Sequence, residues 1–325
     1  MKRNSHFQRL SVFAVFLVFT IFAVSCKKNS GAGASTQTLR QYFSSASQYT
    51  LFNKALQRTG LDTLLGGAIP YTVFAVGDSG MIHSGYTSAG IDTTNIPRLR
   101  RTLLYQIIQG SITSASLQLY QEIPLTTADS GIQAYLEQNN FGLFFNGIPV
   151  AGVDSGLSNG IIQRMQTMAA PPVGDLYTTV GTIPSLSDYN FLIHYVGQYG
   201  SPGDYLRAAS PASPLTVFLP NNTLFAALGW DNLTAIQQGG YFSNVYFWGN
   251  GQYYTCDFLG ASNLFLNADQ FGNRNYLWFT KDGYSFYPNT TVSNGIGNAN
   301  TRYQIVLANI VCTNGVIHTF QPYSY

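Results

Sequence analysis

Apolar and polar residues follow two kinds of pattern along this chain. Residues 49–65 carry apolar side chains at helical spacing, interrupted by Gly60, which is typical of an amphipathic helix with a glycine stop. Residues 71–76 form a β-branched and aromatic run, as expected of a short strand. A second helix is predicted over residues 97–109, because a proline stands near its start and a glycine follows its end.

From residue 132 the pattern changes to strands. The apolar runs 143–148 and 159–162 are separated by turn residues, and each contains an Asn-Gly pair, Asn146-Gly147 and Asn159-Gly160. Such pairs supply the positive φ angles that two-residue hairpins need, so we predict tight turns there. Helices that come before strands, without βαβ alternation, indicate an α+β fold.

Two short segments of the sequence then occur a second time. Thr72-Val73-Phe74-Ala75-Val76 and Asn159-Gly160-Ile161-Ile162 correspond to Thr216-Val217-Phe218-Leu219-Pro220 and Asn314-Gly315-Val316-Ile317. A repeat of this length is domain-sized, because the units of a solenoid are much shorter. We predict a first domain over residues 38–172, a linker over 173–184 after a proline pair, and a second domain over 185–325.

The N-terminus has the pattern of an export signal. A basic start and an apolar run over residues 10–24 precede Ala23-Val24-Ser25-Cys26, which resembles a bacterial lipoprotein cleavage site. We predict a signal peptide over residues 1–25, acylation of Cys26, and a flexible tether over residues 26–37. The alternative is an ordinary cleaved secretory peptide that happens to end near a cysteine.

The leader also carries the apparent positive charge. The chain has 16 Lys and Arg against 14 Asp and Glu, and three of the basic residues precede Cys26. Their removal leaves 13 against 14, a net charge of −1. Since nucleic-acid binding draws on a dense positive surface, the composition argues against that class of partner.

The repeated segments resemble the two signatures of the fasciclin domain, an extracytoplasmic α+β module. Residues 72–81 and 216–225 resemble its Thr-Val-Phe-Ala-Pro box, and Asn314-Gly315-Val316-Ile317-His318 fits its Asn-Gly-x-Ile-His segment. In the first repeat Gln163 stands in place of that histidine. Gln106 stands where the family often has the histidine of a Tyr-His pair. The resemblance implies two tandem fasciclin-like domains, each a β-wedge or sandwich with several helices packed on it.

Residues that could carry chemistry are few. Cys256 and Cys312 remain after the leader is removed, and they either pair in an oxidising compartment or stay buried as free thiols. Gly77-Asp78-Ser79-Gly80 matches the surroundings of a protease nucleophile, but we interpret it as a turn within the fasciclin box. The histidines are scattered without metal-ligand spacing, so no metal, no cofactor and no catalytic residue is predicted.

Aromatic side chains are the strongest binding candidates. The segment 241–258 is rich in them, and Trp248, Tyr246, Tyr253 and Tyr254, together with Asn250, would offer flat faces and amide hydrogen bonds. The alternative is that about half of these rings fill the core, because successive side chains of a strand point to opposite faces.

The sequence therefore predicts a non-catalytic adhesion or binding module at the cell envelope. Its expected partners are the membrane, through the N-terminal lipid, and an envelope or matrix protein or a glycan. We expect an outer-membrane lipoprotein that faces either the periplasm or the cell surface. A glycan-capturing lipoprotein that serves an outer-membrane importer is the alternative function, and an enzyme with an unrecognised site is a third.

Overall fold

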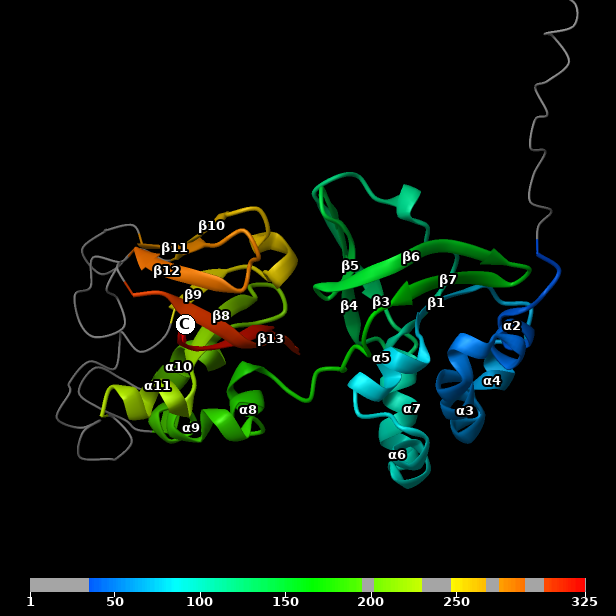
Figure 1. Ribbon diagram of the computed structural model, residues 1–325, viewed down its shortest axis with the longest axis horizontal. Coiled ribbons are helices and arrows are strands. Elements are labelled where there is room, and N and C mark those ends of the chain that lie inside the picture. Colours follow the sequence, from blue (N-terminus) through cyan, green and yellow to red (C-terminus); the bar gives the residue numbers. More distant parts are fainter. Residues whose placement is uncertain (1–34, 195–201, 230–246, 267–274, 290–300, 325) are drawn as a thin grey trace, which may run out of the picture.

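The computed structural model describes residues 35–194, 202–229, 247–266, 275–289 and 301–324 (Figure 1). Within these residues helices and strands are mixed and form two seven-stranded sheets, each with its own helices. The predicted α+β fold is confirmed. Cys26 and the leader lie outside the described residues. None of the helices in the described part of the chain has the length and apolar composition needed to cross a bilayer.

The first unit contains the strands β1 to β7 and the helices before and between them. Its helical elements are α2 (Leu39–Ser45), η2 (Ser47–Tyr49), α3 (Thr50–Thr59), α4 (Leu61–Leu64), α5 (Asp78–His83), α6 (Ser88–Thr93), α7 (Ile96–Tyr105) and η3 (Ser114–Ser116). Its strands are β1 (Tyr71–Val76), β2 (Ile107–Gln109), β3 (Gln121–Thr126), β4 (Gln133–Asn139), β5 (Gly142–Phe145), β6 (Ile148–Leu157) and β7 (Gly160–Met165). The strand order across the sheet is β2-β1-β7-β6-β5-β4-β3.

The second unit contains β8 to β14. Its helical elements are α8 (Leu176–Val180), η4 (Pro184–Leu186), α9 (Ser187–His194), α10 (Pro202–Ala208), α11 (Asn222–Ala227) and η6 (Thr255–Phe258). Its strands are β8 (Leu215–Pro220), β9 (Phe247–Asn250), β10 (Asn263–Leu266), β11 (Asn275–Phe279), β12 (Ser285–Asn289), β13 (Tyr303–Cys312) and β14 (Gly315–Pro322). From β9 to β10 the order is β9-β8-β14-β13-β12-β11-β10, which repeats the order of the first sheet.

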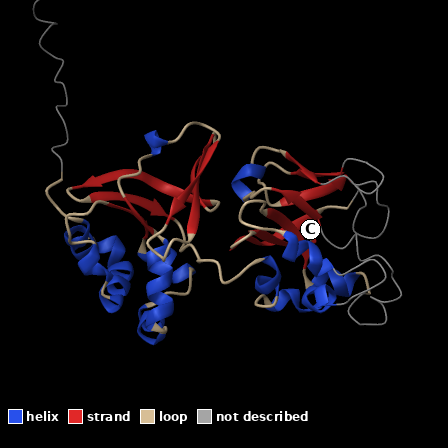
Figure 2. Cartoon of the chain, turned by 180° about the vertical axis from the view of Figure 1, so that it is seen from behind, coloured by secondary structure: helices blue, strands red, loops and turns tan. Residues whose placement is uncertain are grey.

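The two sheets also share their irregularities. In each unit the first strand pairs in parallel with the last, β1 with β7 and β8 with β14, while the other pairings are antiparallel. The β6–β7 and β13–β14 hairpins shift register at corresponding positions, where Asp154 and Asn309 both have a φ of 58°. Figure 2 shows that the α-helices of both units gather on the same side of the molecule.

Each sheet packs on its helices through a separate apolar core. The first core includes Phe43 of α2, Phe74 of β1 and Phe145 of β5, and the second includes Leu192 of α9, Phe218 of β8 and Phe286 of β12. Phe74 and Phe218 occupy the same place in the repeated strand. Burial of such rings supplies the main driving force for folding in each unit.

The signature pairs Asn159-Gly160 and Asn314-Gly315 are not the two turn residues of their hairpins, as we predicted them to be. The two-residue turns of these hairpins are Ser158-Asn159 and Thr313-Asn314, since Leu157 pairs with Gly160 and Cys312 with Gly315. A Cβ on Gly160 would lie 2.1 Å from the carbonyl oxygen of Tyr71, so only glycine permits the close approach of β7 to β1.

The asparagine of each pair fastens helical segments to the sheet. Asn159 accepts a hydrogen bond from the backbone N–H of Leu39 at 2.8 Å and donates to the carbonyl oxygens of Leu65 and Gly67. Asn314 repeats this pattern with Leu176, Leu206 and Ala209 in the second unit. Both asparagines are buried, so their amides satisfy backbone groups that water cannot reach.

The linker prediction differs from the structure. Residues 173–184 contain α8, whose N-cap Asp175 accepts from the N–H of Thr178, and its Leu176 and Val180 lie in the second core. The backbone N–H of Leu176 donates to Asn314, as that of Leu39 donates to Asn159 in the first unit. This segment therefore belongs to the second unit. The other domain limits stay predictions.

Two local predictions also need correction. The helix expected over residues 97–109 ends at Tyr105, because Ile107 and Ile108 pair with Val73 and Thr72 as strand β2. Residues 78–83, which follow β1, form helix α5 where we predicted a turn. The Asn146-Gly147 turn is confirmed, since both residues have positive φ angles between the paired Phe145 and Ile148.

We predict that Asn159→Ala destabilises the first unit by about 3 kcal/mol, because three hydrogen bonds to buried backbone groups are lost at roughly 1 kcal/mol each. Urea unfolding followed by circular dichroism measures the change. Asn53→Ala on α3, whose side chain makes none of these contacts, is the control and should unfold like the wild type. Equal midpoints for Asn159→Ala and wild type would contradict the role of Asn159.

Candidate binding surface

The signature histidine is a buried structural residue. His318 on β14 is fully buried, its Nε2 lies 3.0 Å from the carbonyl oxygen of Tyr253, and its Nδ1 accepts from the backbone N–H of Asn309. A carbonyl oxygen can only accept and a backbone N–H can only donate, so these partners select the neutral ring with its proton on Nε2. Burial lowers the pKa of His318 from 6.5 to about 4, and the bond to Tyr253 opposes that shift.

Gln163 makes the same two contacts in the first unit. Its Nε2 donates to the carbonyl oxygen of Ile112, and its Oε1 accepts from the backbone N–H of Asp154. Ile112 and Asp154 take the places of Tyr253 and Asn309 in the other unit. Glutamine thus replaces histidine with no loss of bonding, which explains the departure from the family segment.

Another signature residue fixes a helix. The carboxylate of Asp78 accepts hydrogen bonds from the N–H of Leu51 at 2.8 Å and from the Thr50 hydroxyl, at the N-terminus of α3. In the second unit Asn222 contacts Asp188 and Ser187 at the N-terminus of α9. The protease-like tetrapeptide around Asp78 is therefore part of the helix-to-sheet packing.

The residues that we predicted for binding do not form one exposed group. Tyr254 is fully buried, and the backbone of Tyr253 is engaged by Thr216 and His318, with its side chain half-buried against the second core. Asn250 is exposed at the end of β9. Trp248 is on the same strand but its side chain lies outside the described residues, as does all of Tyr246. The prediction of an exposed ring is wrong for Tyr254, because it packs between the two units.

The two described cysteines are free, so the disulfide that we considered is absent. Cys312 lies in the second core, whereas Cys256 lies in a separate apolar cluster with Phe144 of the first unit. Burial raises the pKa of both thiols, which keeps them protonated.

An exposed aromatic row lies elsewhere, on the β10–β12 part of the second sheet. Trp278 of β11 is paired directly with Asn263 of β10 on one side and with Tyr287 of β12 on the other. Trp278 is 52% exposed and Tyr287 is 37% exposed, and Asn263 is exposed as well. We call these three residues the aromatic row.

The alternation of the strands places the row on the outer face. Leu277 and Phe279 on either side of Trp278, and Phe286 before Tyr287, point into the second core. Directly opposed residues of an antiparallel pair have their Cβ atoms roughly 5 Å apart, so the two rings are adjacent. Because residues 276–279 are all apolar or aromatic, no alternation in the sequence could have shown which of them is exposed.

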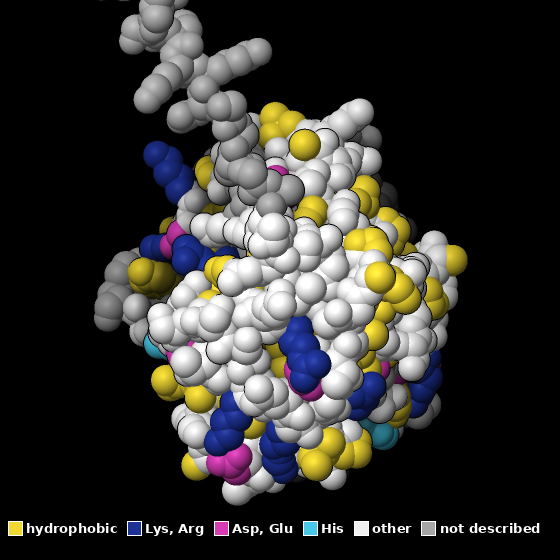
Figure 3. Space-filling view, turned by 90° about the vertical axis from the view of Figure 1, so that its right-hand side faces the viewer, with side chains coloured by type: hydrophobic (Ala, Val, Ile, Leu, Met, Phe, Trp, Pro, Cys, Tyr) yellow, Lys and Arg dark blue, Asp and Glu magenta, His cyan; other side chains and the backbone are white. Residues whose placement is uncertain are grey.

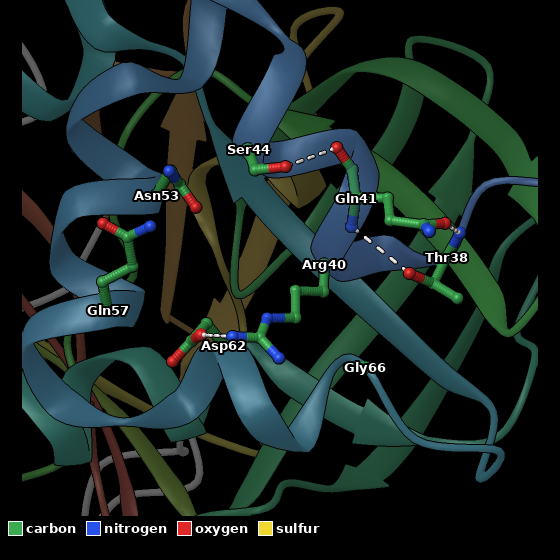
Figure 4. Close-up of a pocket in the computed structure, with 8 residues that line it drawn as sticks. All are labelled: Thr38, Arg40, Gln41, Ser44, Asn53, Gln57, Asp62 and Gly66. Atoms are coloured by element: carbon green, nitrogen blue, oxygen red, sulfur yellow. Dashed lines mark hydrogen bonds and ion pairs between the residues drawn. The ribbon is translucent and has the colours of Figure 1, made fainter.

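A polar pocket of about 510 Å³ lies between α2, α3 and α4 in the first unit (Figure 4). Arg40 and Asp62 form an ion pair across it at 2.9 Å, and Thr38 and Gln41 bond to each other as the capping box of α2. Since these groups satisfy one another, the pocket offers a ligand weaker chemistry than the aromatic row does.

Charged side chains are dispersed over the outer face of the first unit. Figure 3 shows Lys, Arg, Asp and Glu scattered among uncharged polar groups on this face. Three of the ion pairs on the first unit, Arg40–Asp62, Lys54–Asp92 and Arg101–Asp129, neutralise charges locally.

Three comparisons with known proteins found similar sequences and structures. The model of the fasciclin domain matches residues 47–171. Stabilin-1 of Mus musculus is 26% identical over 143 residues, which are 43% of this chain and 6% of that protein, so the chain spans only a small part of this relative. The solved FAS1 domain pair of the insect cell adhesion molecule fasciclin I covers 83% of this chain and 94% of its own, with 14% identity and a TM-score of 0.36.

Residues 47–171, which have an α+β fold, match the fasciclin domain family.

We predict that His318→Gln removes a pH dependence of stability. The pKa of His318 is lower in the folded state than the usual 6.5, so unfolded chains bind more protons between pH 6.5 and about 4. Wild-type stability should fall by about 3 kcal/mol as the pH drops through this window, whereas the His318→Gln variant lacks this contribution. Urea unfolding from pH 4 to 7.5 measures both proteins, and parallel profiles for the variant and the wild type would refute the assignment.

Proposed function

We propose that this protein is a lipid-anchored, extracytoplasmic adhesion module that attaches the cell envelope to a partner through the aromatic row. Fasciclin domains serve in adhesion and binding, and the match of residues 47–171 to this domain supports a non-catalytic role. The observation that carries the proposal is the exposed pair of Trp278 and Tyr287 on a sheet whose other face is core.

The chemistry of the row suits recognition. Large aromatic rings of Trp and Tyr contribute most of the binding energy at many protein interfaces, because they bury much area with little loss of side-chain entropy. The strands beneath them are tied to the core by Phe279 and Phe286, whose ring centroids lie 5.7 Å apart. The row is thus presented on a rigid support, which lowers the entropic cost of binding.

A glycan is the second candidate partner. The side chain of Asn263 flanks Trp278 on the next strand, so the row combines two flat apolar faces with an amide that can both donate and accept. Sugar rings offer an apolar face and hydroxyl groups that match this combination. In this form the protein would capture a glycan at the outer membrane for an importer.

The anchor is expected at Cys26, which follows the apolar leader. Acyl chains on this residue would hold the two units at the membrane without a spanning helix. Residues 27–37 would then give the units reach from the surface, toward the periplasm or the cell exterior.

We expect Cys26→Ala to move the protein from the membrane fraction to the soluble fraction, because the acylation site is lost. Fractionation of expressing cells and detection by immunoblot provide the measurement. Cys312→Ala is the matched control, because it removes a cysteine far from the leader and should leave the protein in membranes. A Cys26→Ala protein that stays in the membrane fraction would disprove the lipid anchor.

We predict that Trp278→Ala combined with Tyr287→Ala weakens attachment about thirtyfold, which corresponds to roughly 2 kcal/mol for the loss of an aromatic anchor. Attachment of protein-coated beads to isolated envelopes tests adhesion, and migration through gels cast with soluble polysaccharides tests glycan capture. Phe191→Ala, which removes an exposed ring of α9, is the control.

The two readouts separate the candidate partners. Loss of bead attachment alone supports the adhesion role, and loss of retardation in the polysaccharide gels supports glycan capture. Because Trp278 is half exposed, its variant should melt close to the wild type, whereas Phe286→Ala should cost about 3–5 kcal/mol of stability. Attachment and gel migration equal to the wild type would reject the aromatic row as the binding surface.

A further inference from the structure

The outer face of the second sheet continues beyond the aromatic row. Phe286 of β12 is paired with Tyr303 of β13, and both rings are buried in the second core. The adjoining positions, Tyr287 and Arg302, therefore lie on the opposite face, because successive side chains of a strand alternate. The backbone N–H of Tyr323 donates to the carbonyl oxygen of Arg302 at 3.0 Å, which makes these two residues neighbours where β13 begins and β14 ends.

Arg302 is stacked on an aromatic ring. Its guanidinium carbon, Cζ, lies 3.7 Å from the centroid of the Tyr323 ring, and both residues are half-buried. The face of the ring attracts the cation, and stacking holds the plane of the guanidinium. The aromatic row, Arg302 and Tyr323 form a band across β10 to β14, which we call the extended row. Five neighbouring strands spaced about 4.8 Å apart make it roughly 19 Å long.

The charge of Arg302 is not neutralised within the described part of the chain. None of the ion pairs found there involves this residue. Its Nε is buried, and no described group accepts a hydrogen bond from it. A buried donor of a charged group without a partner is costly, because water no longer solvates it. An anion beside the guanidinium would balance the charge that the protein leaves unpaired.

Few acids compete for this cation. From residue 270 to residue 325 the sequence has three basic residues and one acidic residue, Asp282. Asp282 accepts hydrogen bonds from the Thr280 hydroxyl at 2.6 Å and from the Tyr284 N–H at 2.9 Å, so its carboxylate is engaged in the β11–β12 turn. The charge of Arg302 acts on Asp282 from a longer distance, without an ion pair between them. The potential around the extended row therefore favours an anion.

We propose that the extended row binds an acidic polysaccharide, with sugar rings stacked on Trp278 and Tyr287 and a carboxylate or sulfate group held by Arg302. Arginine suits this task because its paired N–H donors match the oxygens of a carboxylate. The amide of Asn263 can bond to sugar hydroxyl groups at the other end of the row. The inference rests on the proposed function, since it assigns the partner of the same aromatic rings.

An extended peptide fits this surface less well. Peptides that add to a sheet bond to the free backbone groups of an edge strand. The extended row crosses β11, β12 and β13, each of which has a paired strand on both sides. The row offers ring faces, an amide and one cation, and this combination matches a chain of sugar rings that carries acid groups.

Binding of polysaccharides with and without acid groups tests the proposal. The full chain with Cys26→Ser, which removes the predicted acylation site, is titrated calorimetrically in excess EDTA. The ligands are polygalacturonate and its methyl ester, and dextran sulfate and dextran. This protein should bind at least one acidic polymer about tenfold more tightly than its neutral counterpart. Added Arg302→Gln should abolish the preference, because an amide carries no charge. Arg98→Gln, which removes an exposed cation from α7, is the control and should keep it.

Salt provides a second test that needs no variant of the row. Raising NaCl from about 0.1 M to 1 M shortens the screening length from roughly 10 Å to 3 Å, so the preference for the acidic polymer should nearly vanish. Binding of the neutral polymer should change little. If circular dichroism shows that Arg302→Gln is unfolded, Arg302→Lys replaces it and should retain only part of the preference, because lysine keeps the charge and loses the paired donors.

The outcomes separate this inference from the proposed function. Trp278→Ala with Tyr287→Ala should weaken binding of acidic and neutral polymers alike, whereas Arg302→Gln removes only the preference between them. Equal binding of acidic and neutral polymers, no binding of any of the four, or an unchanged preference in Arg302→Gln would overturn the acidic partner and leave attachment through the aromatic row to its own test. Poly-L-glutamate or an oligonucleotide bound as tightly as the acidic polysaccharide would overturn it too, because charge alone would then account for binding.

Discussion

The parallel pairing of the first strand with the last strand is the interaction on which each unit depends. It joins β1 to β7 and β8 to β14, with one further strand on one side of each pair and four on the other. Parallel neighbours need a long connection, and here that connection contains most of the unit. The pairing therefore brings together segments about ninety residues apart in the first unit and about one hundred in the second, and the helices at the start of each unit then cover the sheet.

The polar residues of the fasciclin signatures serve this pairing. Asn159 and Asn314 bind helix backbone groups at the turn that precedes the last strand, and the following glycines let the strands approach. His318 and Gln163 fill equivalent buried positions with equivalent hydrogen bonds. Signature residues with these roles define the fold, and they leave recognition of a partner to surface positions that differ between the units.

The same region of the duplicated sheet is used in two ways. In the first unit β4 and β5 present Glu137 and Phe144 to the other unit. The matching strands β10 to β12 of the second unit carry Trp278 and Tyr287 on an exposed face. Duplication thus provides one copy of this surface for contact between the units and leaves the other copy exposed, where the proposed adhesion role would use it.

Much of the fold could be predicted from the sequence because its signals are local. Helix α3 with its glycine stop, strand β1 and the Asn146-Gly147 turn follow from spacing and backbone preference within a few residues. Helix α7 was predicted four residues too long, since the apolar pattern of Ile107 and Ile108 suits either a helix or a strand. Pairing with β1 settled that choice.

The type of binding surface could be predicted from the sequence, but its residues could not. An aromatic surface was expected, but the burial of Tyr254 and the exposure of Trp278 depend on which face of each strand meets a core or another unit. The sequence by itself determined the repeated unit, its α+β class and its low charge, because these are properties of local pattern and composition. Only the tertiary structure decided which asparagine bonds which helix and which rings face solvent, because those contacts join residues far apart in the chain.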